Sequence, residues 1–225
     1  MATLKYENRE SEANKASLLS ESKIEIHDNL DLTPLYLSDL EKEVMIIFLD
    51  NVSNVTSALV ERKIQLAFIF GLAESAARKF SSEDINKLSE NVKVPPIYGS
   101  FLKDFSEYIR LEDPQKKKEI ADKIMKKYFI GEGRLSAEKK RHILVRAINK
   151  ISQNTIPSYM KINHSLSILE AKSLLQHSRI GKKILWNVEP HFYQKWLNSH
   201  KQFAYDSLIL RYKDYIVDLA GVKGY

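Results

Sequence analysis

At 225 residues, with 44% hydrophobic and 28% charged residues, the chain can bury a core without disulfides or metals and is not globally disordered. It has no cysteine, which excludes disulfides, thiolate zinc sites, iron–sulfur clusters and a cysteine nucleophile. Its formal net charge is +6, and no apolar stretch approaches the roughly 20 residues of a membrane span, so we expect a cytoplasmic protein without a membrane span.

The first 30 residues predict a polar N-terminal arm. Residues 1–30 show no helical pattern, and only Lys23–His27 alternates between polar and apolar residues as a short strand does. Such an arm is either a loose terminus or a segment that docks on a neighbouring subunit.

Helical patterns fill most of the remaining chain. Ser38 and Glu41 form a capping-box pattern, followed by apolar residues at helical spacing as far as Leu59. A second capping-box pattern at Ser167 and Glu170 predicts a helix that continues to about residue 178. Other helices are expected at about 62–79, from 82 to before 95, and at about 97–111, 114–129, 137–152 and 192–219.

These patterns predict an all-α fold class without a convincing sheet. The expected architecture is a multi-helix bundle of about eight or nine helices, arranged in two lobes behind the extended N-terminal arm. Few glycines and prolines occur for this length, seven and six respectively, which favours long continuous helices over a loop-rich fold.

Charge is distributed unevenly along the chain. Residues 1–96 hold 11 Lys and Arg against 16 Asp and Glu, a net charge of −5. Residues 97–225 hold 24 against 13, a net charge of +11. We therefore expect an acidic helical lobe at 31–111 and a basic helical lobe at 112–225.

One stretch carries most of the excess positive charge. Between Lys139 and Lys201, twelve basic residues face only Glu170 and Glu189. A surface with this many uncompensated cations attracts polyanions, and nucleic acid is the commonest polyanion in a cell. An acidic protein or lipid surface is a second possible partner, and a basic face that only aids solubility is a third.

Aromatic residues alternate with cations towards the end of this stretch. Bases stack on aromatic faces while cations hold phosphates, so this mixture suits single-stranded RNA or DNA, and we expect RNA rather than DNA as the partner. Four of these six aromatics are expected in the core, and the six are Trp186, Phe192, Tyr193, Trp196, Phe203 and Tyr205. The predicted nucleic-acid-binding residues are Lys139, Lys140, Arg141, Arg146, Lys150, Arg179, Lys182, Lys183, Lys195 and Trp196.

Motifs for catalysis and metal binding are not recognisable. The sequence has no phosphate-binding glycine loop, dinucleotide fingerprint, metalloprotease helix motif or nucleophile elbow. Glu189, Pro190 and His191 suggest a turn rather than a metal site, because no second ligand pair supports them. We therefore expect no catalytic residue, no metal and no cofactor.

The function expected from these patterns is binding rather than catalysis. The leading hypothesis is a non-enzymatic, sequence-tolerant, RNA-leaning nucleic-acid-binding protein of nucleoprotein or coat type. Its acidic and basic lobes would attract each other head to tail in a homo-oligomer. The alternative is a helical protein-interaction module, such as an adaptor, a regulator or a secreted effector.

Overall fold

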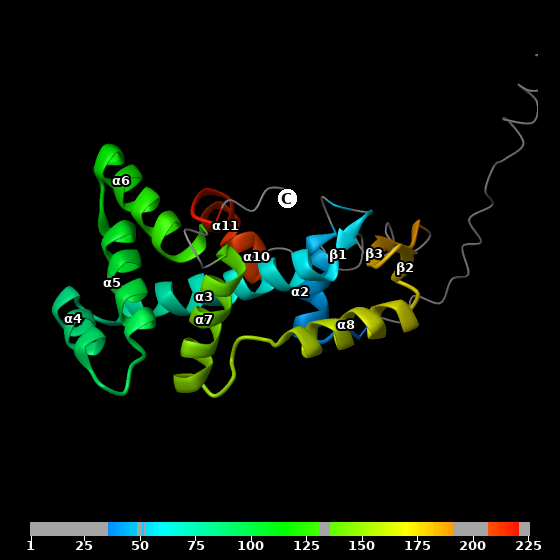
Figure 1. The fold of residues 1–225 in the computed structure, drawn as a ribbon, viewed down its shortest axis with the longest axis horizontal. Coiled ribbons are helices and arrows are strands. Elements are labelled where there is room, and N and C mark those ends of the chain that lie inside the picture. The colour runs from blue at the N-terminus through cyan, green and yellow to red at the C-terminus, as the bar shows by residue number, and fades with distance from the viewer. Residues whose placement is uncertain (1–35, 49–50, 52, 131–135, 191–206, 221–225) are drawn as a thin grey trace, which may run out of the picture. The chain divides into compact units, whose positions relative to one another are not determined.

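The computed structural model describes residues 36–48, 51, 53–130, 136–190 and 207–220 (Figure 1). The described residues form nine α-helices, one π-helix and three short strands, which confirms the predicted all-α class. The predicted arm lies outside them. The elements are α2 (Asp39–Ile47), β1 (Val55–Thr56), α3 (Ser57–Lys79), α4 (Ser82–Glu90), α5 (Pro96–Arg110), α6 (Pro114–Ile124), the π-helix η1 (Met125–Phe129), α7 (Ala137–Ile151), α8 (Tyr159–Ala171), β2 (Leu175–Ile180), β3 (Lys183–Val188), α10 (Leu208–Arg211) and α11 (Lys213–Asp218).

The first helix starts where its capping pattern predicts and ends earlier than expected. The Ser38 hydroxyl accepts a hydrogen bond from the Glu41 amide at 3.3 Å, and the Glu41 carboxylate accepts one from the Ser38 amide at 3.2 Å. The prediction that this helix continues to Leu59 is wrong. Asn54 takes a positive φ of 60°, and Val55 then pairs with Trp186 of β3, so the backbone leaves the helix before α3 begins.

A three-stranded antiparallel sheet in the order β1-β3-β2 was not predicted. Its hairpin turns at Gly181 and Lys182, which connect Ile180 to Lys183. Gly181 has a φ of +61°, a conformation that glycine adopts without steric cost and that suits the first central position of a type II′ turn. The expectation of a chain without a sheet is therefore wrong for this segment.

Helix α8 also differs from the prediction. The capping box expected at Ser167 is absent, because Ser167 lies inside α8 and its hydroxyl donates to the carbonyl of Asn163 at 3.1 Å. The N-cap is Ser158, whose hydroxyl accepts from the amide of Lys161 at 3.4 Å. The helix ends at Ala171 instead of near residue 178, and β2 begins at Leu175.

An aromatic cluster joins helices from both halves of the sequence. The Phe70 ring on α3 lies 5.6 Å from the rings of Phe105 on α5 and Phe129 on η1, and 5.8 Å from Tyr215 on α11. Residues 35–225 accordingly form one compact unit. At the boundary predicted between the acidic and the basic lobe, the net charge of the sequence changes, but the helices on its two sides pack against each other.

Candidate nucleic-acid interface

Helix α7 presents three of the predicted cations on one exposed face. Lys139, Arg146 and Lys150 are spaced by seven and four residues, which places them on one stripe of an α-helix. All three are exposed, whereas Leu144 and Ile148 on the opposite face are buried in the core. We call Lys139, Arg146 and Lys150 the α7 stripe. None of the three forms an ion pair with a carboxylate of the described residues.

Lys140 points towards the end of the π-helix. Its Nζ donates to the main-chain carbonyl of Lys126 at 2.9 Å, so part of its hydrogen-bonding capacity is already used. The neighbouring Lys123 and Lys127 lie 3.0 and 2.9 Å from the buried carboxylate of Asp104. Lys123, Lys127 and Lys140 are therefore partly committed to structural contacts.

The prediction that Arg141 contacts phosphate assumed an exposed guanidinium, and that assumption is wrong. Arg141 is only 5% exposed, and its Nη2 lies 3.7 Å from the buried Glu61 and 3.9 Å from Glu138. Burial lowers the pKa of Arg141, although Glu61 and Glu138 act in the opposite direction. Its role in the structure is to balance the charge of Glu61 on α3.

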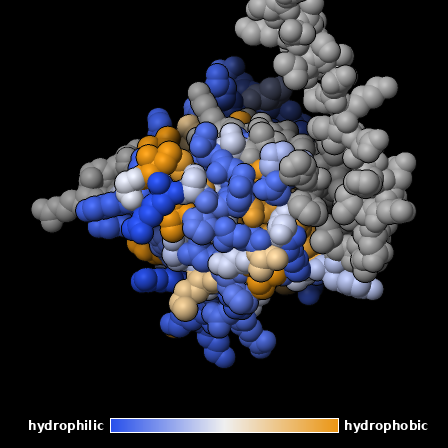
Figure 2. Space-filling view, turned by 90° about the vertical axis from the view of Figure 1, so that its right-hand side faces the viewer, coloured by the Kyte–Doolittle hydropathy of each residue, from blue (hydrophilic) through white to orange (hydrophobic). Residues whose placement is uncertain are grey.

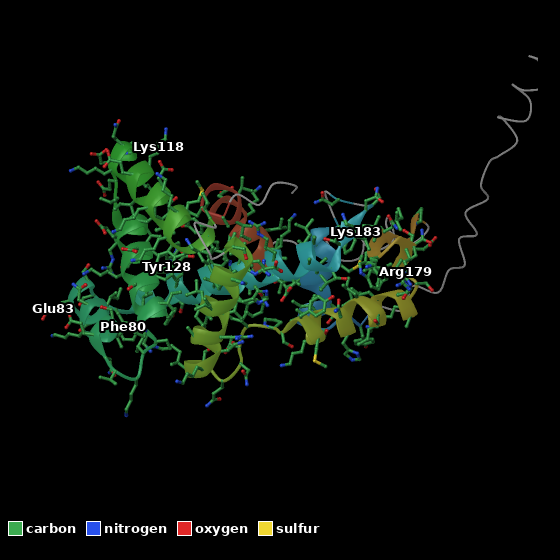
Figure 3. All side chains as sticks on the ribbon, viewed as in Figure 1. Phe80, Glu83, Lys118, Tyr128, Arg179 and Lys183 are labelled. Carbon is green, nitrogen blue, oxygen red and sulfur yellow. The ribbon has the colours of Figure 1, made fainter. Side chains whose placement is uncertain are left out.

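The β2–β3 hairpin carries a second set of predicted cations. Arg179, Lys182 and Lys183 are exposed at and next to the turn, and none pairs with a described carboxylate. Arg179 and Lys183 lie at the end of the unit that carries the sheet, away from Lys118 on α6 (Figure 3). Figure 2 looks onto that end and shows hydrophilic side chains interrupted by small hydrophobic patches. We call Arg179, Lys182 and Lys183 the hairpin cations.

The predicted residues fall into two groups rather than one. The α7 stripe belongs to a helix that packs against α3, α5 and η1, whereas the hairpin packs against β1, α8 and α3 (Figure 1). Lys195 and Trp196 lie outside the described residues. A ligand that contacts both groups therefore has to be extended, which suits a polymer better than a small molecule.

Trp186 and His177 have structural roles within the sheet. Trp186 is 6% exposed, and its indole Nε1 donates to the Ser57 hydroxyl at 2.9 Å. His177 packs beside it at 5.4 Å between ring centroids, and its Nδ1 lies 2.6 Å from a carboxylate oxygen of Glu170. The buried Trp186 ring is therefore not available for stacking a base.

The start of α8 carries exposed residues that were not among the predicted site residues. Tyr159 and Met160 are 49% and 80% exposed, and Lys161 is also exposed. The prediction overlooked them because it placed the helix start at Ser167. A signal for them exists in the sequence, since Ser158 directly follows Pro157 and is a good N-cap residue.

Carboxylates are few in the sequence around the α7 stripe. Glu138 precedes Lys139 on α7, but no Asp or Glu occurs from Lys139 to Leu169, a stretch that includes the rest of α7, its connection to α8 and most of α8. A cation that is already paired with a carboxylate gains little binding free energy from a phosphate. A hydrated, unpaired cation can instead neutralise a phosphate and release the counterions condensed on it. The α7 stripe is therefore suited to bind a polyanion.

The described part of the chain holds no group of three or more His, Cys, Asp or Glu side chains placed to bind a metal ion. Within the same residues, no helix has both the length and the apolar character required to cross a membrane. No protein-family model, curated protein or solved structure matches this chain.

Proposed function

We propose that this chain binds nucleic acid, RNA in preference to DNA, through the α7 stripe and the hairpin cations. The observation that carries this proposal is that all six cations are exposed and that none is paired with a carboxylate among the described residues. Folded proteins usually intersperse the two signs of charge, so six unpaired cations in two groups favour an anionic partner.

The binding would be sequence-tolerant, because lysine and arginine on an exposed surface contact phosphates rather than base edges. Each phosphate contact releases condensed counterions, and the affinity should therefore fall steeply with salt. A protein that coats a strand in this way would act as a nucleoprotein or coat protein. The proposal assigns the chain a binding role and no reaction.

Salt-dependent binding to a fluorescent single-stranded RNA tests this proposal. About five phosphate contacts predict a slope of about −3.5 in log K against log salt concentration. Replacing Arg146 and Lys150 by Gln should flatten the slope by about 1.4, since each phosphate contact contributes about 0.7. The same loss is expected for Lys182→Ala with Lys183→Ala.

A matched control separates local contacts from net charge. Lys116→Gln with Lys118→Gln removes two exposed charges from α6, outside both groups of cations, and should leave the slope nearly unchanged. If all three double variants reduce binding equally, the effect is one of net charge alone. Absence of RNA binding at about 50 mM salt would rule out the proposed function.

Protein interaction is the second candidate function, because the hairpin also exposes apolar side chains. Ile180 and Ile184 are 65% and 46% exposed, and β2 is an edge strand whose outer side has no partner strand among the described residues. The proposed partner is a second copy of this chain, bound head to tail. Helix α4 offers the complementary charge, since it exposes Glu83, Asp84 and Glu90.

A further inference from the structure

The connection between α7 and α8 is held firmly in place. The Asn149 side chain donates to the carbonyl of Ile156 at 3.0 Å and accepts from its amide at 2.8 Å. The Gln65 amide on α3 donates to the carbonyl of Pro157 at 3.2 Å, and both Ile156 and Pro157 are buried. The start of α8 is therefore positioned by bonds to two other helices rather than by the chain alone.

This connection brings an exposed tyrosine close to the α7 stripe. Tyr159 follows Ile156 by three residues, so its backbone lies within about 10 Å of that of Ile156, which the Asn149 side chain holds. Lys150 is the next residue after Asn149, and Arg146 lies one helical turn before Lys150. The tyrosine and the cations are thus within reach of a few consecutive nucleotides.

The tyrosine side chain has no competing role in the described structure. Tyr159 is 49% exposed and forms no side-chain hydrogen bond or ring contact with the other described residues. The exposed Met160 and Lys161 follow it, and no Asp or Glu occurs in this stretch of sequence. An exposed aromatic ring beside unpaired cations is the combination that single-stranded nucleic acid requires.

We propose that the α7–α8 corner, formed by Arg146, Lys150, Tyr159, Met160 and Lys161, binds single-stranded RNA with one base stacked on the Tyr159 ring. This inference depends on the proposed function and adds to it the class of strand and the stacking residue. In a duplex the base faces are covered by their neighbours, so a duplex would engage only the cations.

The test compares a single-stranded RNA with a duplex of the same length. Tyr159→Leu should weaken single-strand binding about tenfold and leave duplex binding unchanged, because only the single strand offers a free base face. Tyr159→Phe should retain the wild-type affinity, since it keeps the ring. The salt slope should be the same in all three proteins, as no charge is changed.

A control tyrosine is available elsewhere on the surface. Tyr36 is 83% exposed and lies in the acidic part of the sequence, so Tyr36→Leu should not alter RNA binding. Melting curves of all variants should coincide with that of the wild type, because both tyrosines are substantially exposed. A variant with a lower melting temperature would be measured well below its transition.

The outcomes distinguish this inference from the proposed function. If the wild type binds neither RNA at about 50 mM salt, the proposed function fails and the stacking inference fails with it. If it binds RNA but Tyr159→Leu changes nothing, or weakens the duplex equally, only the stacking inference is overturned. Equal losses for Tyr159→Leu and Tyr159→Phe would indicate hydroxyl recognition and also overturn it. If Tyr159→Leu weakens binding to phosphatidylserine vesicles and leaves RNA binding unchanged, the corner binds lipid and the stacking inference is overturned.

Discussion

Two arginines on α7, five residues apart, show how the same side chain serves different purposes on different faces of one helix. Arg141 is buried beside Glu61, whereas Arg146 is exposed and unpaired among the described residues. Both arginines lie in the same basic stretch of sequence. Their burial differs because Arg141 faces Glu61 on α3. Composition can locate a basic stretch, but it cannot tell which of its cations neutralise a buried acid.

This difference predicts opposite effects of one substitution. Arg141→Gln leaves the buried carboxylate of Glu61 without its cation and should lower the free energy of unfolding by about 3 kcal/mol. Arg146→Gln should change it by less than about 0.5 kcal/mol. Urea unfolding monitored by circular dichroism measures both. Similar stabilities for the two variants would contradict the assignment of Arg141 to the core.

At the scale of elements, a buried carboxylate connects α5 to the α6–η1 segment. Asp104 accepts hydrogen bonds from Lys127 at 2.9 Å and from the Tyr128 hydroxyl at 2.8 Å, and Lys123 lies 3.0 Å away. Burial by itself raises the pKa of Asp104, but the bonds from Lys127, Lys123 and Tyr128 outweigh it and hold that pKa below its ordinary value of 3.8. The ionised form is therefore favoured by folding.

The sign of this shift predicts how stability changes with pH. A carboxylate whose pKa is lowered by folding contributes stability above its unfolded pKa and loses it as pH falls through the folded value. Asp104→Asn should cost about 2–3 kcal/mol at neutral pH, and its difference from the wild type should shrink below about pH 4. The exposed Asp122 on α6 provides the control, since Asp122→Asn should have little effect at any pH. A constant difference between Asp104→Asn and wild type across this range would contradict the network.

Several helix starts, although not that of α8, were predictable because caps are local interactions. Ser38, Asp113 and Ser136 each accept main-chain hydrogen bonds from residues two or three positions later, so the sequence pattern itself contains both partners. Residue spacing alone sets that Lys139, Arg146 and Lys150 share a stripe of α7. It did not separate them from Arg141, which was predicted as a site residue and is buried.

The sheet was not predictable from local patterns. Strand β1 pairs Val55 with Trp186, two residues separated by most of the sequence, and it is only two residues long. Five of the six residues of β2 are exposed, so β2 lacks the alternation that identifies a half-buried strand. The exposure of Tyr159 was missed for a related reason, because it depends on where α8 begins.

At the scale of the whole molecule, a single packed unit carries opposite charges on its two halves of sequence. Phe70 of the acidic half packs with Phe105, Phe129 and Tyr215, which all belong to the basic half. The change in net charge along the sequence therefore does not coincide with a boundary between two separately packed domains. A chain with a net charge of −5 in one part and +11 in the other is suited instead to contacts between copies, in which unlike regions meet.

Head-to-tail association predicts a salt-dependent oligomer in protein freed of RNA by nuclease treatment. Light scattering after size exclusion should detect oligomers at about 0.1 M salt and monomers at about 1 M, where charges are screened within about 3 Å. Lys182→Glu with Lys183→Glu should abolish the oligomer, and so should Glu83→Lys with Glu90→Lys on α4. Mixing the two variants should restore association, because the intact α4 of the first attracts the intact hairpin of the second and the two reversed surfaces also attract each other. Lys116→Glu with Lys118→Glu is the charge-matched control and should still associate. An oligomer that persists at high salt, or variants that fail to associate when mixed, would show that α4 and the hairpin are not the contact.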